Sequence, residues 1–238
     1  MSQSLLLQPI GIVRTDFPDK FGIPHQGTIA ASLPGTIILN PEYRKEGILR
    51  GLESYSHLWV IWCFSRSSGW SVTVRPPRLG GKKRLGVFAT RSPNRPNPLG
   101  LAEVKISEVN EADFTISVLE ADLADGTPLY DIKPYLPYCD SVPCALPGIS
   151  AGPLPHLCVR IPEALQELIP ADKRSVLICI LQLDPRPACQ HDPDRIYHME
   201  YAGMDLSFQV HDNILEVTGI HACAETETGK EPHDSHEI

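Results

Sequence analysis

HLWVIWCF, residues 57–64, is a nearly continuous apolar run that is rich in β-forming residues. Serine and tyrosine precede it, and serine, arginine and glycine follow it, so the run is bounded by residues that favour loops. A short apolar run with such borders is typical of a strand in the interior of a β-rich fold. We therefore predict a strand that is buried on both faces.

Short segments of the same kind surround this run in the first half of the chain. Turn signals separate them, such as Leu-Pro-Gly at 33–35 and Asn-Glu-Ala-Asp at 110–113. No long helical pattern occurs before about residue 135, so a β-barrel or a β-sandwich is favoured. The expected strands are Leu5–Thr15, Thr28–Ala31, Gly35–Leu39, Trp70–Val74, Leu85–Ala89, Leu99–Val109 and Phe114–Leu119.

The pattern changes after Ile132–Gly148, a proline-rich stretch that we expect to be irregular. Pro162 and Pro170 each suit the first turn of a helix, and an apolar stripe at helical spacing follows the second of them. Strands are then expected at Ile196–Tyr201, Leu206–Val210 and Ile214–Ile220. These elements predict a second, smaller unit, whose helical stripe consists of Val176, Leu177, Ile180 and Leu181.

One uninterrupted basic segment stands out in an acidic chain. From Ser54 to Ala102 there is no aspartate or glutamate, whereas the whole chain has a net charge of −8. A solvated charged surface normally mixes both signs, so this segment predicts contact with an anionic partner. Its core is VTVRPPRLGGKKRLGVFATRSPNRPNPLGL, residues 72–101, and its cations are Arg66, Arg75, Arg78, Lys82, Lys83, Arg84, Arg91 and Arg95.

Several classes of protein are disfavoured by what the sequence lacks. No apolar run approaches the ~20 residues of a membrane-spanning helix, and the N-terminus has no secretory pattern. Seven cysteines without a CxxC pair fit a reducing cytosol, and Cys189 with His191 and His198 matches no common metal-ligand spacing. The nucleotide-binding GxxxxGK[ST] and GxGxxG patterns and the GxSxG nucleophile elbow are also missing. We expect a soluble, cytoplasmic protein with no metal.

Three segments combine charged side chains with prolines: RLGVFATRSPNRPNPLG, DLADGTPLYDIKPYLP and DPRPA, which begin at residues 84, 122 and 184. Because proline fixes φ, such segments hold their side chains in place before a ligand arrives, which lowers the entropy cost of binding. Proline-rich loops also stabilise barrels without binding anything. Three such segments in one chain favour a binding site.

These segments also carry a resemblance. GVFATRSPNRPNPLG (86–100), preceded by SHLWV (56–60) and TVRPPRLGG (73–81) and followed by DLADGTPLYDIKPYLP and DPRPA, resembles the tRNA threonylcarbamoyladenosine N6-methyltransferase family. The resemblance covers about residues 5–220. It implies a mainly β fold that forms a homodimer. The implied parts are a β-barrel methyltransferase domain at 1–150, a small α+β C-terminal domain at 151–222 and a disordered tail at 223–238.

The reaction that the resemblance implies moves the methyl group of S-adenosyl-L-methionine to N6 of threonylcarbamoyladenosine, next to the anticodon of tRNA. The residues that match the family's cofactor contacts come from five places in the chain. Ser65-Arg66 replaces the His-Gln that some relatives carry, Cys189 stands where a tyrosine usually follows DPRPA, and an Arg-Trp pair is missing near Leu206–Phe208. The implied cofactor contacts are Pro24, His25, Gln26, Ser65, Arg66, Arg91, Leu101, Asp122, Leu123, Asp125 and Gly126.

Residue chemistry suggests the other roles. The target nitrogen is conjugated to a purine and to a carbonyl, so its proton must leave, and Asp131, Lys133 and Tyr135 are the candidates for orientation or proton transfer. The threonyl carboxylate suits a guanidinium, which Arg95 or Arg186 could supply. The predicted contacts with substrate and tRNA are Arg75, Arg78, Lys82, Lys83, Arg84, Arg95, Asn97 and Arg186.

Two alternatives remain open at this level. A non-catalytic RNA-binding or regulatory protein could keep the barrel and bind S-adenosylmethionine as a signal, although the intact ATRS and DLADGTP motifs favour an enzyme. A methyltransferase for small molecules would not need the basic segment.

Overall fold

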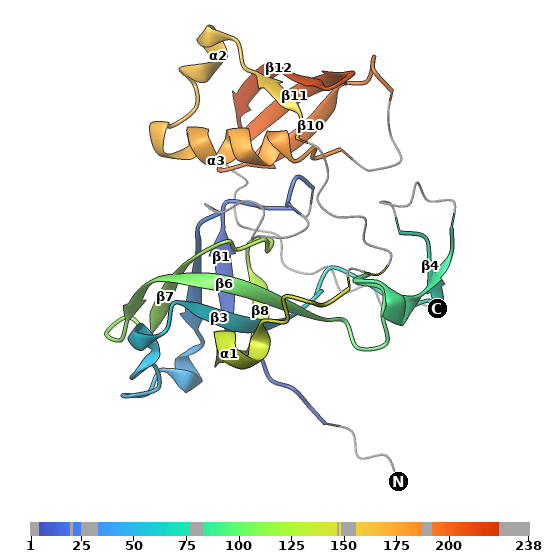
Figure 1. Cartoon of the computed structure of the whole chain (residues 1–238). Coiled ribbons are helices and arrows are strands. Elements are labelled where there is room, and N and C mark those ends of the chain that lie inside the picture. Colours follow the sequence, from blue (N-terminus) through green and yellow to red (C-terminus); the bar gives the residue numbers. More distant parts are fainter. Residues whose placement is uncertain are drawn as a thin grey trace, which may run out of the picture.

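The computed structural model describes residues 5–19, 21–24, 33–76, 83–146, 148, 156–186 and 192–223. Its larger part is a closed six-stranded barrel, in which every neighbouring pair of strands is antiparallel (Figure 1). Around the barrel the order is β1, β2, β7, β6, β3, β8. The strands are β1 Gly11–Thr15, β2 Gly35–Leu39, β3 His57–Cys63, β6 Leu99–Asn110, β7 Thr115–Leu119 and β8 Thr127–Pro134.

Alternate side chains of the barrel strands point inward and form a hydrophobic core, and Thr127 at the start of β8 is a buried polar residue of the same strands. In β3 the fully buried side chains are Leu58 and Val60, whereas the alternating residues Trp59 and Ile61 are partly exposed. The prediction that this strand is buried on both faces is therefore wrong, because the outer wall of the barrel is covered only in part. The strand itself is confirmed, as are Gly35–Leu39 and the β6–β7 pair.

The sixth strand, β8, was missed in the sequence. It pairs with β1 on one side and with β3 on the other, and so closes the barrel. The prediction that Ile132 begins an irregular stretch is wrong, because residues 132–134 continue β8. Tyr130 is the extra residue of a bulge, since Ile61 pairs with Asp131 and Trp62 with Leu129. After β8 comes one short helix, α1 Pro137–Asp140.

An arm projects from the barrel between β3 and β6 (Figure 1). Its regular part consists of two two-residue strands, β4 Thr73–Val74 and β5 Leu85–Gly86, followed by the 3-10 turn Val87–Ala89. The expected strand 70–74 is thus much shorter than predicted. We use "the arm" for residues 65–98, of which 77–82 lie outside the described residues.

The C-terminal unit, residues 156–223, is a four-stranded sheet with one long helix. The sheet order is β10 Tyr197–Tyr201, β11 Met204–His211, β12 Ile214–Ala222 and β9 Cys158–Arg160. Helices α2 Glu163–Gln166 and α3 Ala171–Gln182 begin after Pro162 and Pro170, as predicted. All four residues of the α3 stripe are buried in the core of this unit. Strand β9 was not predicted.

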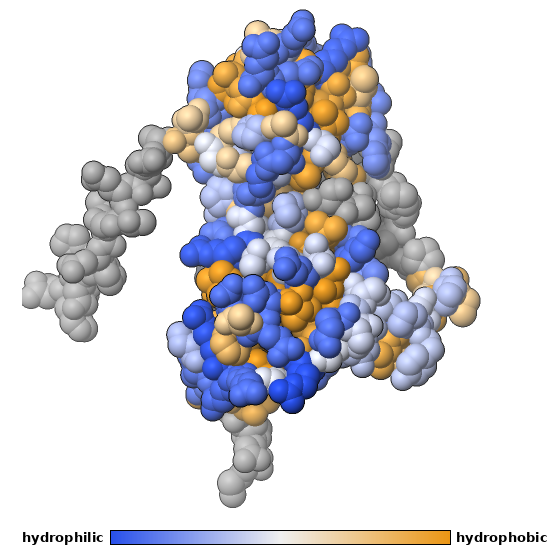
Figure 2. Space-filling model, turned by 90° about the vertical axis from the view of Figure 1, so that its left-hand side faces the viewer, coloured by the Kyte–Doolittle hydropathy of each residue, from blue (hydrophilic) through white to orange (hydrophobic). Residues whose placement is uncertain are grey.

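The two parts appear in Figure 2 as two lobes, with hydrophobic residues showing between hydrophilic ones on each. Phe17 and Leu33, which flank the connection between β1 and β2, are buried in the core of the C-terminal unit rather than in the barrel core. Predicted strand Thr28–Ala31 lies outside the described residues, as does the tail from 224. None of the described helices is long and apolar enough to span a bilayer.

Candidate active site

Three segments that were predicted to contact the cofactor leave the barrel at the same end. Val13 near the end of β1 pairs with Thr127 at the start of β8, and Trp62 near the end of β3 pairs with Leu129. Cys63 at the end of β3 pairs with Leu99 at the start of β6. The loop after β1, the arm and the β7–β8 turn therefore emerge at the same end, which we call the site end.

The β7–β8 turn, residues 121–126, is held by hydrogen bonds from β1. Asp125 accepts bonds from Arg14 Nη1 at 2.8 Å and from the Thr15 amide at 3.0 Å, and the Gly126 amide donates to the Val13 carbonyl at 2.9 Å. Gly126 has φ +74°, a conformation that glycine adopts without strain. A Cβ placed there would meet no atom of the described residues within 4 Å, so the described part of the chain leaves open space beside the turn.

Arg66 links this turn to the loop after β1. Its Nη2 donates to the Asp125 carbonyl at 3.1 Å, and its Nη1 donates to the Pro18 carbonyl at 2.7 Å. The guanidinium also lies 3.5 Å from the Asp19 carboxylate. Arg66 therefore connects the start of the arm with the loop after β1 and with the 121–126 turn. Pro24 is buried in the same loop, whereas His25 and Gln26 lie outside the described residues.

The ATRSPNRPN segment is braced by its own side chains. Thr90 Oγ1 donates to the Val87 carbonyl and accepts from the Ser92 amide, and Arg95 Nη1 donates to the Thr90 carbonyl at 3.3 Å. Arg91 is exposed, and no described residue is its hydrogen-bond partner. The loop thus holds Arg95 in place while Arg91 faces solvent, which suits Arg91 for contact with a ligand.

Gly100 has a packing reason to be glycine. It pairs with Trp62 across β3 and β6, and a Cβ there would lie 2.2 Å from Trp62 Cε2. The Trp62 ring packs in turn against Phe64, with centroids 4.2 Å apart. This contact fixes the start of β6, and the next residue, Leu101, points outward with 59% of its surface exposed.

Two of the three predicted catalytic residues, Asp131 and Lys133, lie on the outer wall of β8, and Tyr135 follows its last residue. Lys133 Nζ is 2.9 Å from Asp131 Oδ2, and both side chains are about half exposed. Asp131 shares a row with Ile61 and Leu101, because Ile61 pairs with both residues. Two strand spacings separate Asp131 from Leu101, which is about 10 Å.

Tyr135 lies at the opposite end of the barrel from the 121–126 turn. Its amide donates to the carbonyl of His57, the first residue of β3, and its ring packs on Trp59 at 5.4 Å. Seven residues of extended strand span roughly 20 Å, so Tyr135 is far from Arg66 at the other end of β3. The three residues therefore do not surround one point, and Asp131 is the member nearest to the site end.

Arg186 is engaged within the C-terminal unit. Its Nε and Nη2 each donate to the Asp184 carboxylate at 2.8 Å, and 8% of its side chain is exposed. The hydrogen bond with Asp184 raises the pKa of Arg186. The Nε and Nη2 donors of Arg186 are therefore already engaged, whereas Arg95 is bonded through Nη1 in the described residues.

The remaining predicted contacts lie on the arm. Arg75, Lys83, Arg84 and Asn97 are exposed, and Arg78 and Lys82 lie outside the described residues. Within the described part of the chain, no three histidine, cysteine, aspartate or glutamate side chains converge as a metal site would require. Arg14 and Thr15 were missed, because their contact with Asp125 joins residues more than a hundred positions apart.

Both parts of the chain match domains of known proteins. Residues 12–141 match the model of the tRNA-methyltransferase O N-terminal domain, and residues 157–223 match that of the TrmO C-terminal domain. The tRNA (adenine(37)-N6)-methyltransferase of Escherichia coli K12 is 39% identical over 196 residues, which are 78% of this chain and 83% of the relative.

Two further relatives come from Pseudomonas aeruginosa. A putative S-adenosylmethionine-dependent methyltransferase, RcsF, is 38% identical over 84% of this chain and 90% of its own length. A crystal structure of TrmO matches 93% of this chain and 100% of its own, with a TM-score of 0.74 and 30% identity. The chain therefore belongs to the tRNA-methyltransferase O family of S-adenosylmethionine-dependent tRNA methyltransferases.

Proposed function

We propose that the chain methylates N6 of adenine 37 in tRNA and that its substrate is the adenine that already carries a threonylcarbamoyl group. The observation that carries this proposal is the convergence of the loop after β1, the arm and the 121–126 turn at one end of the barrel. Together with Leu101 at the start of β6, these segments hold every residue that the resemblance assigns to the cofactor. The curated relatives supply the position of the methylated atom in their names.

S-adenosylmethionine would lie against the 121–126 turn, in the open space beside Gly126. The cofactor supplies an activated methyl group on a sulfonium cation, so the protein's task is to place a nucleophile in line with it. The turn is fixed in advance by Arg14, Thr15 and Arg66, which lowers the cost of ordering it on binding. The remaining proposed contacts are Pro24, His25, Gln26, Ser65, Arg91, Leu101, Asp122, Leu123 and Asp125.

Asp131 is our first candidate for removing the proton of the target nitrogen. It lies in register with Ile61 and Leu101 on the outer wall of the barrel, and its ion pair with Lys133 holds the carboxylate in place. Lys133 would act through Asp131. Tyr135 is the weakest of the three candidates, because it lies near His57 at the other end of β3.

The arm would bind the tRNA backbone. Arg75, Lys83 and Arg84 are exposed on it, and the acid-free composition of residues 54–102 leaves their charge uncompensated within the segment. The C-terminal unit has the opposite balance, with five lysines or arginines against ten aspartates or glutamates in residues 156–223. Polyanion binding is therefore assigned to the arm and not to the C-terminal unit.

The carboxylate of the threonylcarbamoyl group would pair with Arg95. Its Nη1 is held by the Thr90 carbonyl, which leaves other donors of the same guanidinium for a ligand. This contact would explain a preference for the modified adenine, because an unmodified adenine offers no carboxylate.

The test is methyl transfer from labelled S-adenosylmethionine to two otherwise identical tRNAs, one with and one without the threonylcarbamoyl group. We expect label in the modified tRNA at N6 of adenine 37 and at most a few per cent of that rate in the other. Equal rates on both tRNAs would refute the substrate assignment. Binding of S-adenosylmethionine without transfer to either tRNA would favour the regulatory alternative instead.

Assembly and location complete the proposal. We propose a cytoplasmic homodimer in which residues 1–150 form the methyltransferase domain, 151–222 the C-terminal domain and 223–238 a tail. Exposed apolar side chains on the arm and on the barrel wall, such as Trp70, Phe88 and Leu101, support burial against another surface. The molar mass in solution, measured by light scattering, tests the dimer.

A further inference from the structure

The loop after β1 packs against the C-terminal unit through residues at both of its ends. Phe17 is 1% exposed, and its ring packs on Tyr201 of β10 with centroids 5.3 Å apart. Leu33, at the other end of this loop, is fully buried in the same core. Both residues belong to the barrel half of the chain, yet the C-terminal unit provides their apolar environment.

The same two residues hold the two ends of the 121–126 turn through their backbones. The Asp125 amide donates to the Phe17 carbonyl at 2.7 Å, and the Ala121 amide donates to the Leu33 carbonyl at 3.1 Å. Each residue thus has its side chain in the C-terminal core and its carbonyl on the turn. Any shift of that core moves the acceptors to which the turn is bonded.

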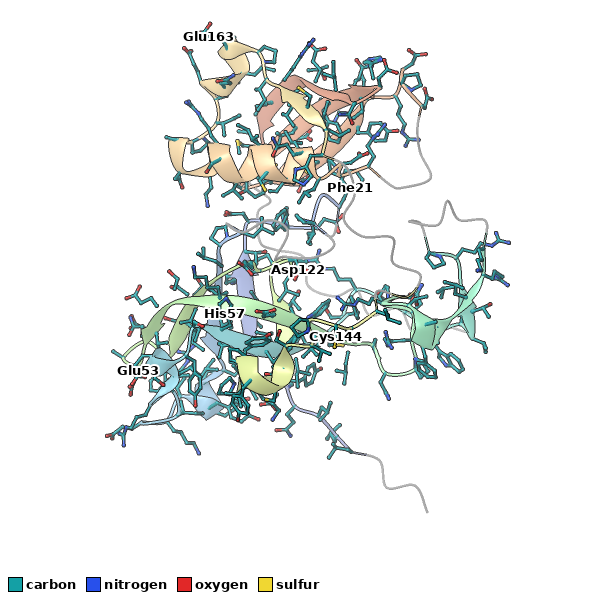
Figure 3. The ribbon with its side chains drawn as sticks, in the orientation of Figure 1. Phe21, Glu53, His57, Asp122, Cys144 and Glu163 are labelled. Carbon is teal, nitrogen blue, oxygen red and sulfur yellow. The ribbon has the colours of Figure 1, made fainter. Side chains whose placement is uncertain are left out.

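Polar contacts reinforce this junction. Lys173 of α3 forms an ion pair with Asp16 at 2.5 Å, with about a quarter of each side chain exposed. The Ala202 amide donates to the Asp16 carbonyl at 2.9 Å. Burial, together with the nearby carboxylates of Asp16 and Asp172, raises the pKa of Tyr201, which keeps this phenol neutral beside the ion pair. Figure 3 shows Phe21 and Asp122 between the two lobes, with Glu53 at the far end of the barrel.

We infer that the C-terminal unit positions the cofactor turn, by clamping Phe17, Leu33 and Asp16, and so sets the affinity for S-adenosylmethionine. This inference rests on the placement of the cofactor at the 121–126 turn proposed above. The negative charge of the C-terminal unit agrees with it, because a unit with twice as many acidic as basic residues is poorly suited to hold tRNA phosphates. Phe17 and Lys173 are positioning residues, since they act through the turn.

The main test compares two conservative core variants of the full-length protein. Phe17→Leu removes the ring that packs on Tyr201, whereas Leu215→Val trims a residue of the same core on β12, two strands away from β10. We expect similar falls in melting temperature. In isothermal titration calorimetry, Phe17→Leu should raise the Kd for S-adenosylmethionine about tenfold, and Leu215→Val should leave it within about twofold.

Kinetics separate positioning from general damage. For Phe17→Leu we expect a higher KM for S-adenosylmethionine, with kcat at saturating cofactor and KM for tRNA both within about twofold of the parent. Lys173→Met should show the same split to a smaller extent, about threefold, and Lys173→Arg should restore the parent value because it keeps the ion pair with Asp16. The two Lys173 variants test the inference even if Phe17→Leu does not fold.

The outcomes are distinguishable. Equal cofactor affinity in Phe17→Leu, Lys173→Met and the parent overturns the inference, as does a loss of affinity in Leu215→Val that matches the loss in Phe17→Leu. Asp122→Ala tests the underlying placement of the cofactor. If Asp122→Ala weakens binding and Phe17→Leu does not, the turn binds the cofactor without help from the C-terminal unit. If Asp122→Ala binds normally, the placement itself is wrong.

Discussion

The 121–126 turn and the arm leave the same end of the barrel, but they are supported very differently. The turn is bonded at both ends and through the Asp125 side chain, to residues of β1, to Arg66 and to residues anchored in the C-terminal core. In the described residues of the arm, regular pairing is limited to four residues, and Trp70, Val72 and Phe88 are exposed. A rigid site suits a small cofactor, whereas a loosely supported basic arm suits a large polyanion of variable surface.

This difference predicts that substitutions in the two regions affect different steps. Changes at the rigid side of the site end should alter cofactor binding or chemistry. Changes to the exposed cations Arg75, Lys83 and Arg84 of the arm should alter tRNA affinity and its dependence on salt.

Asp131→Asn carries the largest expected effect. If Asp131 accepts the proton of the target nitrogen, kcat should fall by about a hundredfold or more, while the Kd for S-adenosylmethionine stays unchanged. Single-turnover kinetics with modified tRNA measure this. Glu103→Gln is the matched control, because it removes a carboxylate from the neighbouring row of the same wall, opposite Trp59. A parent-like kcat in Asp131→Asn would remove the wall of β8 from the chemistry.

Neutralising the arm comes next. Replacing Arg75, Lys83 and Arg84 together by glutamine should weaken tRNA binding roughly thirtyfold near physiological salt. The slope of log K against log salt should become shallower by about 2–3, since each phosphate contact contributes ~0.7–0.9. Filter binding over a salt series measures both quantities, and calorimetry should show an unchanged Kd for S-adenosylmethionine. Lys45→Gln with Arg50→Gln, on exposed cations outside the arm, controls for the loss of two of the three positive charges. An unchanged slope would separate the arm from tRNA.

Sequence patterns predicted the elements that local spacing determines. The β6–β7 hairpin and the α3 stripe follow from alternation and from helical periodicity, which involve residues close together in the chain. Strand β8 was missed because its prolines and its bulge at Tyr130 disrupt the alternating pattern. Closure of the barrel by β8 depends on pairing with β1 and β3, which no local pattern encodes.

The sequence named segments that leave the barrel at one end, but it did not reveal the contacts that support them. The resemblance named Asp125 and Arg66, but it gave no reason to connect Arg14 with Asp125 or Phe17 with Tyr201. Those contacts join residues far apart in the chain, and apolar side chains such as Phe17 and Leu33 look the same in sequence whichever core they enter. The assignment of Tyr135 to the chemistry assumed that DIKPYLP is a loop, whereas β8 carries it to the opposite end of the barrel.

Asp125→Ala tests the support of the 121–126 turn, with a smaller expected effect. Loss of the bonds from Arg14 and the Thr15 amide should lower the free energy of unfolding by about 1–2 kcal/mol and raise the Kd for S-adenosylmethionine about tenfold. Urea denaturation and calorimetry measure the two effects. Asp113→Ala is the control, because it removes a carboxylate bonded to Asn110 in the β6–β7 hairpin at the other end of the barrel. Equal cofactor affinity in both variants would mean that the preformed turn is not what binds the cofactor.

Arg95→Met and Arg186→Met form the finest test, since they compare one arginine of the arm with one of the C-terminal unit. Arg95 keeps free donors beside the ATRS segment, so its loss should reduce the preference for threonylcarbamoylated over unmodified tRNA about fivefold, as expected for one partly exposed ion pair of about 1 kcal/mol. Arg186 donates from Nε and Nη2 to Asp184, so its loss should lower the melting temperature and leave that preference within about twofold. The ratio of kcat/KM on the two tRNAs measures the preference. If Arg186→Met lowers the preference and Arg95→Met does not, the substrate carboxylate binds at the C-terminal unit. Arg186 would then have to release Asp184 and bind the substrate when tRNA binds.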